Sequence, residues 1–364
     1  MSSYHIAVIP GDGIGPEVCK ATVQVIKLAL PKSIHLGFIE YPAGAAHFLS
    51  SGVALPDSTI EGCRNADAIL LGAAGLPGVL YDDGTEAGQD TTLRLRPELD
   101  LYANVRPIKL YKGIYGPLKG DPAIDYVIVR ENTEGLYASR GKGIVEGSIS
   151  ARDTMEITRK GVERIVRKAA EICMQRNGAP DDGKRRVTIC DKSNVLRSFA
   201  FFRSIADEVL SEFPEIEVNY ALVDALSMYL VTKPTYYDVI VCENLLGDII
   251  SDLGAATIGG LGLADSSEIG DQHGLFQASH GSAPDIAGKN IANPTATILS
   301  GASMLEWLGR KHADKLLLQS ASKIRQAIAT TFIQGNTLTA DLGGDASTTI
   351  FVEEICSQLT LQNS

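Results

Sequence analysis

Two aspartates, Asp248 and Asp252, have the side-chain type and the spacing to hold a cation. If the segment is helical, residues four apart lie on one face, and two neighbouring carboxylates repel each other unless a cation lies between them. Carboxylate oxygens favour hard ions such as Mg²⁺ and Mn²⁺. A bare pair of this kind is more often a solvated surface feature. Apolar and small residues flank this pair at 245–246 and 253–256, and because uncompensated acids are expensive to bury, a metal site is favoured.

Arginines form the second group of candidate functional residues. Arg94 and Arg96 lie in segment 91–100, Arg106 follows, and Arg130 ends a β-branched run. For any one of them a surface salt bridge is the simpler interpretation. Arg130, however, is expected at the carboxyl end of a parallel strand, where open α/β sheets bind ligands. Several guanidinium groups together bind carboxylates bidentately, so these residues indicate an anionic substrate.

The elements that must position these side chains alternate along the chain. Strands are expected at 5–9, 34–40, 68–72, 126–130, 187–190 and 237–242, and helices at about 16–30, 154–177, 198–213 and around the aspartate pair. The alternation predicts an α/β protein with a largely parallel sheet. The Gly/Pro-rich segments 72–88 and 113–122 are predicted to be long loops, which often carry function.

The glycine-rich segments exclude two classes of nucleotide site. Segment 11–17 lacks the dinucleotide fingerprint G-x-G-x-x-G, because Pro16 occupies the place of the third glycine. A strand, a tight turn and a helix that opens with proline explain this segment. The phosphate loop G-x-x-x-x-G-K-[ST] of a phosphotransfer enzyme is missing from the sequence.

Composition sets further limits. The 364 residues are 45% hydrophobic and 21% charged, with a formal net charge of −11, which disfavours nucleic acid as a partner. No apolar run approaches the roughly 18 residues of a membrane helix, and the first strand begins too early for a signal peptide. We therefore expect a cytoplasmic protein that does not bind membranes. The six cysteines are scattered and are interpreted as buried thiols, forming neither disulfides nor a zinc site.

Five motifs together resemble the β-decarboxylating dehydrogenases, a family that includes the isocitrate, isopropylmalate, homoisocitrate and tartrate/D-malate dehydrogenases. The motifs are GDGIGPE at 11–17, RENTEGLY at 130–137, DKSNVL at 191–196, NLLGDIISD at 244–252 and HGSAPDIAGK at 280–289. They occur in the family's order, and the likeness runs from residue 5 to 345. It implies an α/β fold of the isocitrate/isopropylmalate dehydrogenase type, not a Rossmann fold, with two α/β domains around a central cleft. Residues 1–101 and 259–364 would form the large, cofactor-bearing domain, and 102–258 the small domain with the dimer contact.

The resemblance also implies roles for individual residues. Arg96, Arg106 and Arg130 would grip the two carboxylates of a malate backbone, and Thr92 and Leu93 would face its third substituent. Mg²⁺ or Mn²⁺ would be bound by Asp248 and Asp252 together with Asp224 of the partner subunit. The residues implied in catalysis are Tyr137, Lys192 and Asp224, with Lys192 also contributed by the partner. Lys192 would transfer the proton of the C2 hydroxyl, and Tyr137 would protonate the product of decarboxylation.

The implied cofactor is NAD, with K⁺ as a candidate additional ion. The residues expected to bind NAD are His280, Gly281, Ser282, Ala283, Asp285, Ile286 and Asn293. The carboxylate of Asp285 can accept hydrogen bonds from both ribose hydroxyls, whereas it would repel the 2′-phosphate of NADP. Relatives often carry Glu where Gln277 stands, near the nicotinamide, and this departure predicts altered turnover or hydride geometry.

The substrate signals disagree. Leu93 and Thr92 make the expected pocket half apolar, and Asp90 would repel a third carboxylate, although Arg94 is close. These residues favour a small 3-substituted D-malate of the 3-isopropylmalate, tartrate or D-malate type. The RENTEG form of the second motif instead resembles isocitrate, homoisocitrate and tartrate/D-malate members, so isocitrate and homoisocitrate stay open as alternatives. A catalytically silent regulatory relative is a rival hypothesis, which the complete set of implied residues disfavours. We expect a homodimer with shared active sites, or a pair of such dimers.

Overall fold

The computed structural model describes residues 2–363 and divides the chain into two compact units. Unit 1 contains residues 1–100, 111–115 and 259–364, and unit 2 contains residues 101–110 and 116–258. Among residues 2–363, no helix is both long enough and apolar enough to cross a bilayer.

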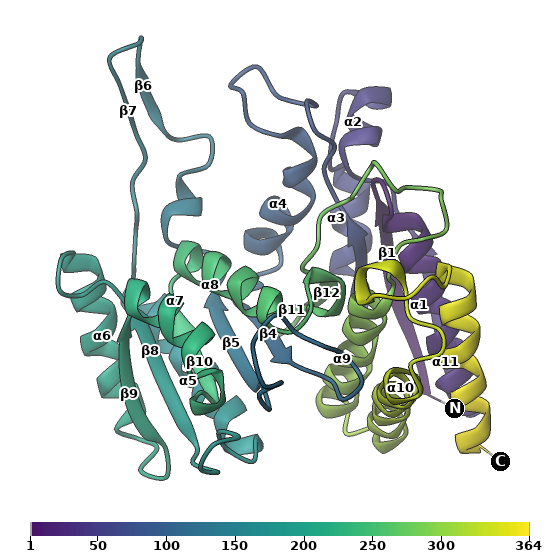
Figure 1. Ribbon diagram of the computed structural model, residues 1–364. Helices are drawn as coiled ribbons and strands as arrows, with labels where there is room; N and C mark the ends of the chain where they lie inside the picture. The colour runs from purple at the N-terminus through teal and green to yellow at the C-terminus, as the bar shows by residue number, and fades with distance from the viewer. Residues whose placement is uncertain (1, 364) are drawn as a thin grey trace. The chain divides into compact units, whose positions relative to one another are not determined.

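Unit 1 is an α/β layer built on a sheet with the strand order β2-β1-β3-β12-β11 (Figure 1). Its strands are β1 (Ser2–Gly11), β2 (Ile34–Glu40), β3 (Ala68–Ala73), β11 (Asp265–Ile269) and β12 (Gly274–Ala278). Its helices are α1 (Gly15–Ala29), α2 (Ala45–Ser51), α3 (Asp57–Arg64), α4 (Asp90–Glu98), α9 (Thr295–Lys311), α10 (Lys315–Gln334) and α11 (Thr348–Asn363). Pairing is parallel except between β11 and β12. Helix α9 packs on β3, β11 and β12, and contacts α1 and α10.

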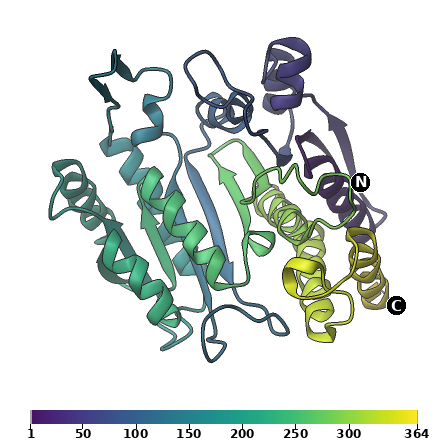
Figure 2. The same cartoon turned by 45° about the horizontal axis from the view of Figure 1, so that its top comes forward.

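Unit 2 is a second α/β layer, with the strand order β4-β5-β10-β8-β9. Its strands are β4 (Ala103–Lys109), β5 (Asp125–Glu131), β8 (Arg186–Asp191), β9 (Glu217–Leu222) and β10 (Val239–Cys242), and the hairpin β6 (Ile144–Glu146) and β7 (Ser150–Arg152) projects from it (Figure 1). Its helices are α5 (Arg159–Gln175), α6 (Arg197–Leu210), α7 (Val223–Thr232) and α8 (Asn244–Thr257). Only β4 and β5 pair antiparallel within this five-strand order. Figure 2 shows α7 and α8 side by side, and α8 packs on β4, β5 and β10.

The expected strands and helices are confirmed, because their apolar periodicity matches the faces that they bury. Strand β3 is buried along its whole length, as an apolar run in a parallel sheet should be. Helix α1 opens with Pro16 in its first turn and buries Val18, Thr22 and Val25 on one face.

Two expectations differ from the structure. The helix expected from residue 154 begins at Arg159, because Thr158 adopts extended backbone and its side chain accepts a hydrogen bond from the backbone N–H of Gly161. Five cysteines are buried thiols as expected, whereas Cys356 is only half-buried; all six are free.

Candidate functional site

The aspartate pair lies on α8, one turn apart on the same face, as predicted. The helix is started by Glu243, whose carboxylate accepts hydrogen bonds from the backbone N–H groups of the next turn. Gly247 is required here by a close approach, since a Cβ atom at this position would lie 2.6 Å from Cγ of Arg130. The missing side chain therefore lets Arg130 pass beside the helix and reach the first aspartate.

Arg130 is bound tightly to α8. Its Nη1 forms an ion pair with Asp248, and its side chain is 1% exposed. Its Nε and Nη2 donate to Oδ1 of Asn244 at 3.1 and 2.6 Å. Asn244 therefore orients the guanidinium independently of the aspartate. Sequence reasoning missed Asn244, although it belongs to the same motif as the aspartates.

Arg106 completes a cluster of two cations and two anions. Its Nη2 lies 3.4 Å from Oδ1 of Asp248, and its Nη1 lies 3.4 Å from Oδ1 of Asp252. Ser251 accepts a hydrogen bond from Nη1 at 2.6 Å. Two arginines face two aspartates, so the cluster is neutral without any ligand.

Tyr137 belongs to the same cluster. Its hydroxyl donates to Oδ2 of Asp248 at 2.8 Å, and its ring centroid lies 5.4 Å from the guanidinium carbon of Arg130. Unit 2 therefore brings together Tyr137, two of the three predicted metal ligands and two of the three predicted carboxylate-binding arginines. The phenol is held where a proton can pass between it and a group bound at the acids.

The electrostatics of the pair suit a cation. Partial burial, with repulsion from Asp248 added, raises the pKa of Asp252 above its ordinary value, despite the attraction of Arg106. A divalent ion bound to both carboxylates would offset the cost of burying the negative charge and the repulsion between the two acids. Two carboxylates supply only part of the coordination of Mg²⁺ or Mn²⁺. Among residues 2–363, no group of three or more His, Cys, Asp or Glu side chains lies close enough to hold a metal within one chain, so Asp224 is not brought to this pair.

Lys192 and Asp224 form a separate pair in unit 2. Nζ of Lys192 lies 2.6 Å from Oδ1 of Asp224, whose side chain is 65% exposed, and this contact lowers the pKa of Asp224. The neighbouring Asp191 does not pair with Lys192, because it is fully buried and accepts hydrogen bonds from Nε and Nη2 of Arg203 at 2.7 and 2.8 Å. The ammonium group of Lys192 is thus presented at the surface. Its contribution to a partner's site stays a prediction.

Helix α4 of unit 1 carries three of the predicted substrate residues. Thr92 and Leu93 are four and three positions before Arg96 and share its helix face. Arg94 lies elsewhere, since its Nη1 donates to the backbone oxygen of Leu55 at 3.4 Å and its side chain is 43% exposed. Thr92 and Leu93 thus lie beside Arg96 on this helix, and their contact with a substrate stays a prediction.

Arg96 is held by an acid that sequence reasoning did not identify. Glu268 on β11 accepts hydrogen bonds from Nε and Nη2 of Arg96 at 3.0 and 2.8 Å. Gln277 on β12 donates to the same carboxylate at 2.7 Å. No sequence pattern around Arg96 or Glu268 predicts this pairing, because the two residues are 172 positions apart.

The predicted cofactor loop, 280–289, is irregular as expected and is fixed to the start of α1. The backbone oxygen of Ser282 accepts a hydrogen bond from the N–H of Ile14 at 2.8 Å, and Ile286 packs against the cluster of Ile14, Val18 and Ala292. Asp285 is exposed. The loop thus presents an acid at the surface beside an apolar patch.

Two buried polar atoms of this loop region lack hydrogen-bond partners, Oγ of Ser279 and Nε2 of His280. Burial lowers the pKa of His280, which favours the neutral imidazole. Unsatisfied buried polar atoms are costly, so they are suited to meet the polar groups of a ligand. Asn293 differs, because its amide oxygen accepts a hydrogen bond from Thr295 N–H at 3.0 Å and its amide nitrogen donates to Asp341 at 2.9 Å.

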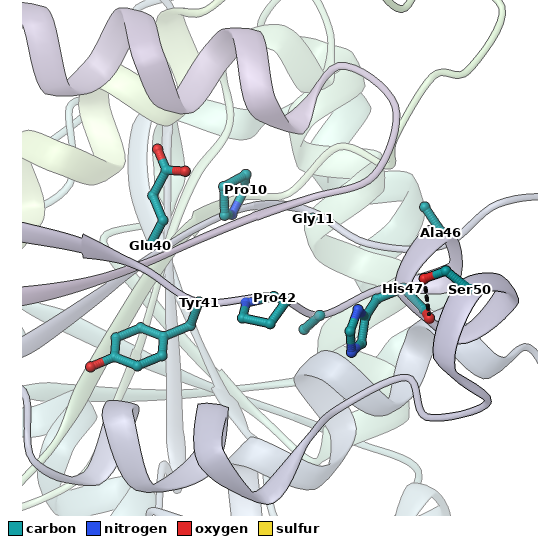
Figure 3. Close-up of a pocket in the computed structure, with 9 residues that line it drawn as sticks. Pro10, Gly11, Glu40, Tyr41, Pro42, Ala46, His47 and Ser50 are labelled. Carbon is teal, nitrogen blue, oxygen red and sulfur yellow. Dashed lines mark hydrogen bonds between the residues drawn. The ribbon is translucent and has the colours of Figure 1, made fainter.

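An open pocket of about 510 Å³ lies in unit 1 where β1 and β2 end (Figure 3). It is lined by Pro10, Gly11, Glu40, Tyr41, Pro42, Ala43, Ala46, His47 and Ser50. None of these residues was predicted to bind substrate, metal or cofactor.

Known proteins resemble this chain over almost its whole length. Residues 5–356 match the family described as isocitrate/isopropylmalate dehydrogenase. A 3-isopropylmalate/3-methylmalate dehydrogenase of Methanocaldococcus jannaschii is 45% identical, covering 98% of this chain and 99% of the relative. A 3-isopropylmalate dehydrogenase of Archaeoglobus fulgidus is 42% identical, covering 97% and 99%. The crystal structure of isocitrate dehydrogenase from Methylococcus capsulatus has a TM-score of 0.85 at 37% identity, covering 98% of this chain and 99% of that one.

Proposed function

The chain belongs to the isocitrate/isopropylmalate dehydrogenase family, and we propose that it oxidatively decarboxylates a 3-alkylmalate with NAD and a divalent metal ion. Like its relatives, it is an oxidoreductase that acts on a CH–OH group. The observation that carries the proposal is the cluster in unit 2, where two acids, two arginines and a tyrosine meet.

The residues of this cluster divide the work. Arg106 and Arg130 bind the substrate carboxylates bidentately, with Arg96 of unit 1 as a third hydrogen-bonding group. Asp248 and Asp252 hold Mg²⁺ or Mn²⁺, which when bound supplies Lewis-acid polarisation of the substrate oxygens. Both arginines pair with the acids in this structure, and a cation held by Asp248 and Asp252 would free them to bind the substrate.

Two further groups move protons. Lys192, as its neutral amine, accepts the proton of the C2 hydroxyl and becomes an ammonium group, which the carboxylate of Asp224, 2.6 Å away, keeps oriented. NAD held by loop 280–289 would supply the acceptor for the hydride on C2. Tyr137 donates its phenolic proton to the carbon that has lost CO₂, and its bond to Asp248 places it at the acids.

The substrate class is inferred from α4. Thr92 and Leu93 offer a methyl, a hydroxyl and an isobutyl group beside Arg96, which suits a small alkyl substituent. Arg94 donates a hydrogen bond to the backbone oxygen of Leu55, which disfavours a role for Arg94 in binding a third carboxylate beside Arg96. The relatives named as 3-isopropylmalate and 3-methylmalate dehydrogenases support this choice.

NAD is the proposed cofactor, and loop 280–289 is its proposed site. Exposed Asp285 can accept hydrogen bonds from the ribose hydroxyls, and Ile286 with the apolar cluster offers a surface for the adenine. The unpartnered atoms of Ser279 and His280 support a ligand in this region. A kinetic preference for NADP would refute the choice of NAD.

A homodimer completes the proposed site. Lys192 and Asp224 would act on the partner's substrate and metal. Exposed apolar side chains on the neighbouring helices α7 and α8, among them Met228, Val231 and Ile249, support an interface beside these residues. Sedimentation should give a dimer or a dimer of dimers, and a fully active monomer would contradict the shared site.

The test is a substrate panel. NADH formation is measured with Mn²⁺ and K⁺ on 3-isopropylmalate, 3-methylmalate, D-malate, the tartrates, isocitrate and homoisocitrate. A 3-alkylmalate is expected to give the highest kcat/KM. If isocitrate or homoisocitrate is preferred, the reading of α4 is wrong, and absence of turnover on all of them favours the silent-relative hypothesis.

A further inference from the structure

The pairing of Arg96 with Glu268 limits what Arg96 can do. The carboxylate of Glu268 is fully buried, the side chain of Arg96 is 7% exposed, and two hydrogen bonds of 3.0 and 2.8 Å join them in a bidentate arrangement. Such a pair fixes the plane of the guanidinium as well as its position. Arg96 is therefore held firmly before any substrate arrives.

Gln277 fixes the acid in turn. The β11–β12 ladder sets Gln277 opposite Ser266, two residues from Glu268, so the two side chains lie diagonally on one face. The amide of Gln277 donates to Oε1 of Glu268 at 2.7 Å. Residues of α4, β11 and β12 thus form one chain of contacts, which is buried at Arg96 and Glu268 and half-buried at Gln277.

The charge of this group differs from that of a free arginine. Arg96 and Glu268 together carry no net charge, and Nε and Nη2 are already donating to the acid. A substrate carboxylate brought to Arg96 would lie near a buried carboxylate. Like charges in a buried setting repel more strongly than in water. The pair can orient one carboxylate, and it penalises each additional negative charge.

We propose that Glu268, oriented by Gln277, is a positioning and specificity-determining residue that fixes Arg96 and disfavours substrates with a third carboxylate. The inference rests on the proposed function, in which Arg96 contacts the substrate.

Glu268→Gln tests it, because this change keeps the size of the side chain and removes its charge. The ratio of kcat/KM for isocitrate to that for 3-isopropylmalate should rise at least about tenfold, because the variant removes the repulsion between the third carboxylate and Glu268. The rise should come mainly through a lower KM for the tricarboxylate. A purely structural role would lower kcat/KM for both substrates and leave the ratio unchanged, which would overturn the inference.

A binding assay separates this inference from the proposed function. Tricarballylate and 2-methylsuccinate lack a hydroxyl group and cannot be oxidised, so calorimetry with Mn²⁺ present measures their affinities without turnover. Glu268→Gln should raise the affinity for tricarballylate relative to that for 2-methylsuccinate by about tenfold, since the repulsion of the third carboxylate is removed. This shift in a protein that oxidises no 3-alkylmalate would sink the proposed function and support the role of Glu268. Oxidation of a 3-alkylmalate by the unaltered protein, with no shift of affinity in Glu268→Gln, would support the proposed function and overturn the role of Glu268.

Two variants control for folding. The exchange Glu268→Gln with Gln277→Glu conserves net charge and an amide–carboxylate contact while moving the acid off Arg96, and it should shift both ratios in the same direction even if Glu268→Gln alone does not fold. Asp265→Asn removes another buried acid of β11, three residues away and therefore on the opposite face. It should leave both ratios unchanged, and a shift as large as that of Glu268→Gln would contradict the assignment.

Discussion

Exchange of the ion pairs around Asp248 predicts that the metal ion and a dicarboxylate strengthen each other's binding. Without ligands, Arg106 and Arg130 are paired with Asp248, and Arg106 also with Asp252. A bare dicarboxylate must compete with these acids for the arginines. Once Mn²⁺ occupies the acids, the arginines are released and the cluster gains two positive charges, which a dicarboxylate neutralises.

The size of the coupling follows from the geometry. Unit charges 3.4 Å apart, as in the contacts of Arg106 with the two aspartates, attract by about 5 kcal/mol at an effective dielectric constant of about 20, and by about 1 kcal/mol in water. The aspartate side chains are 33% and 56% exposed, so the value lies toward the lower end. Partial exchange gives a coupling of about 1–3 kcal/mol, or roughly 5–150-fold in affinity.

The assay is calorimetric titration of 2-methylsuccinate with and without saturating Mn²⁺, and of Mn²⁺ with and without 2-methylsuccinate. The two factors must be equal by linkage, and each should fall in the expected range. Asp248→Asn should abolish most of the coupling. Glu171→Gln, which removes a surface acid paired with Lys168 on α5, should leave it intact. A factor below about twofold in the unaltered protein would refute the exchange.

Three further outcomes are expected. Lys192→Ala should lower kcat by about 10²–10⁴-fold and leave Tm nearly unchanged, since its pair with Asp224 lies at the surface; a large loss of Tm would point to a structural role. Partial burial raises the pKa of Asp252, so its carboxyl group binds a proton more tightly in the folded protein than in the unfolded chain. The contribution of the protonated group to stability is therefore lost as pH rises through the raised pKa. Asp252→Asn should therefore stabilise the metal-free protein at neutral pH, with no gain below the ordinary carboxyl pKa, as measured by urea unfolding at both pH values; a loss at neutral pH would contradict this sign. Gly13→Ala should cost about 2 kcal/mol or more and weaken NADH binding in a fluorescence titration, because φ is +57° and a Cβ would lie 1.9 Å from the backbone oxygen of Ser282; unchanged stability would show that the loop can move away.

Much of the fold follows from local patterns in the sequence. The strands around Val8 and Ile128 are apolar runs that fit buried strands of a sheet. Strand β5 extends one residue beyond the predicted 126–130 at each end, whereas β1 extends beyond the predicted 5–9 by three residues at its start and two at its end. The aspartates of α8 lie on one face because helical spacing alone sets their positions.

The partners of the charged residues could not be predicted in this way. Arg96 and Glu268 are 172 positions apart, and no spacing rule connects them. The contact of Gly247 with the stem of Arg130 likewise depends on how α8 packs on β5. The motifs indicated which side chains act, whereas tertiary packing decides which of them are already paired before a ligand binds.

The most direct test of the proposed reaction is simultaneous measurement of NADH formation and ¹³CO₂ release, with 3-isopropylmalate labelled with ¹³C in the carboxylate on C3, in the presence of Mn²⁺ and NAD. We expect both products in equal amounts, and loss of both in Asp248→Asn. NADH without labelled CO₂, or neither product from any 3-alkylmalate, would contradict oxidative decarboxylation by this cluster.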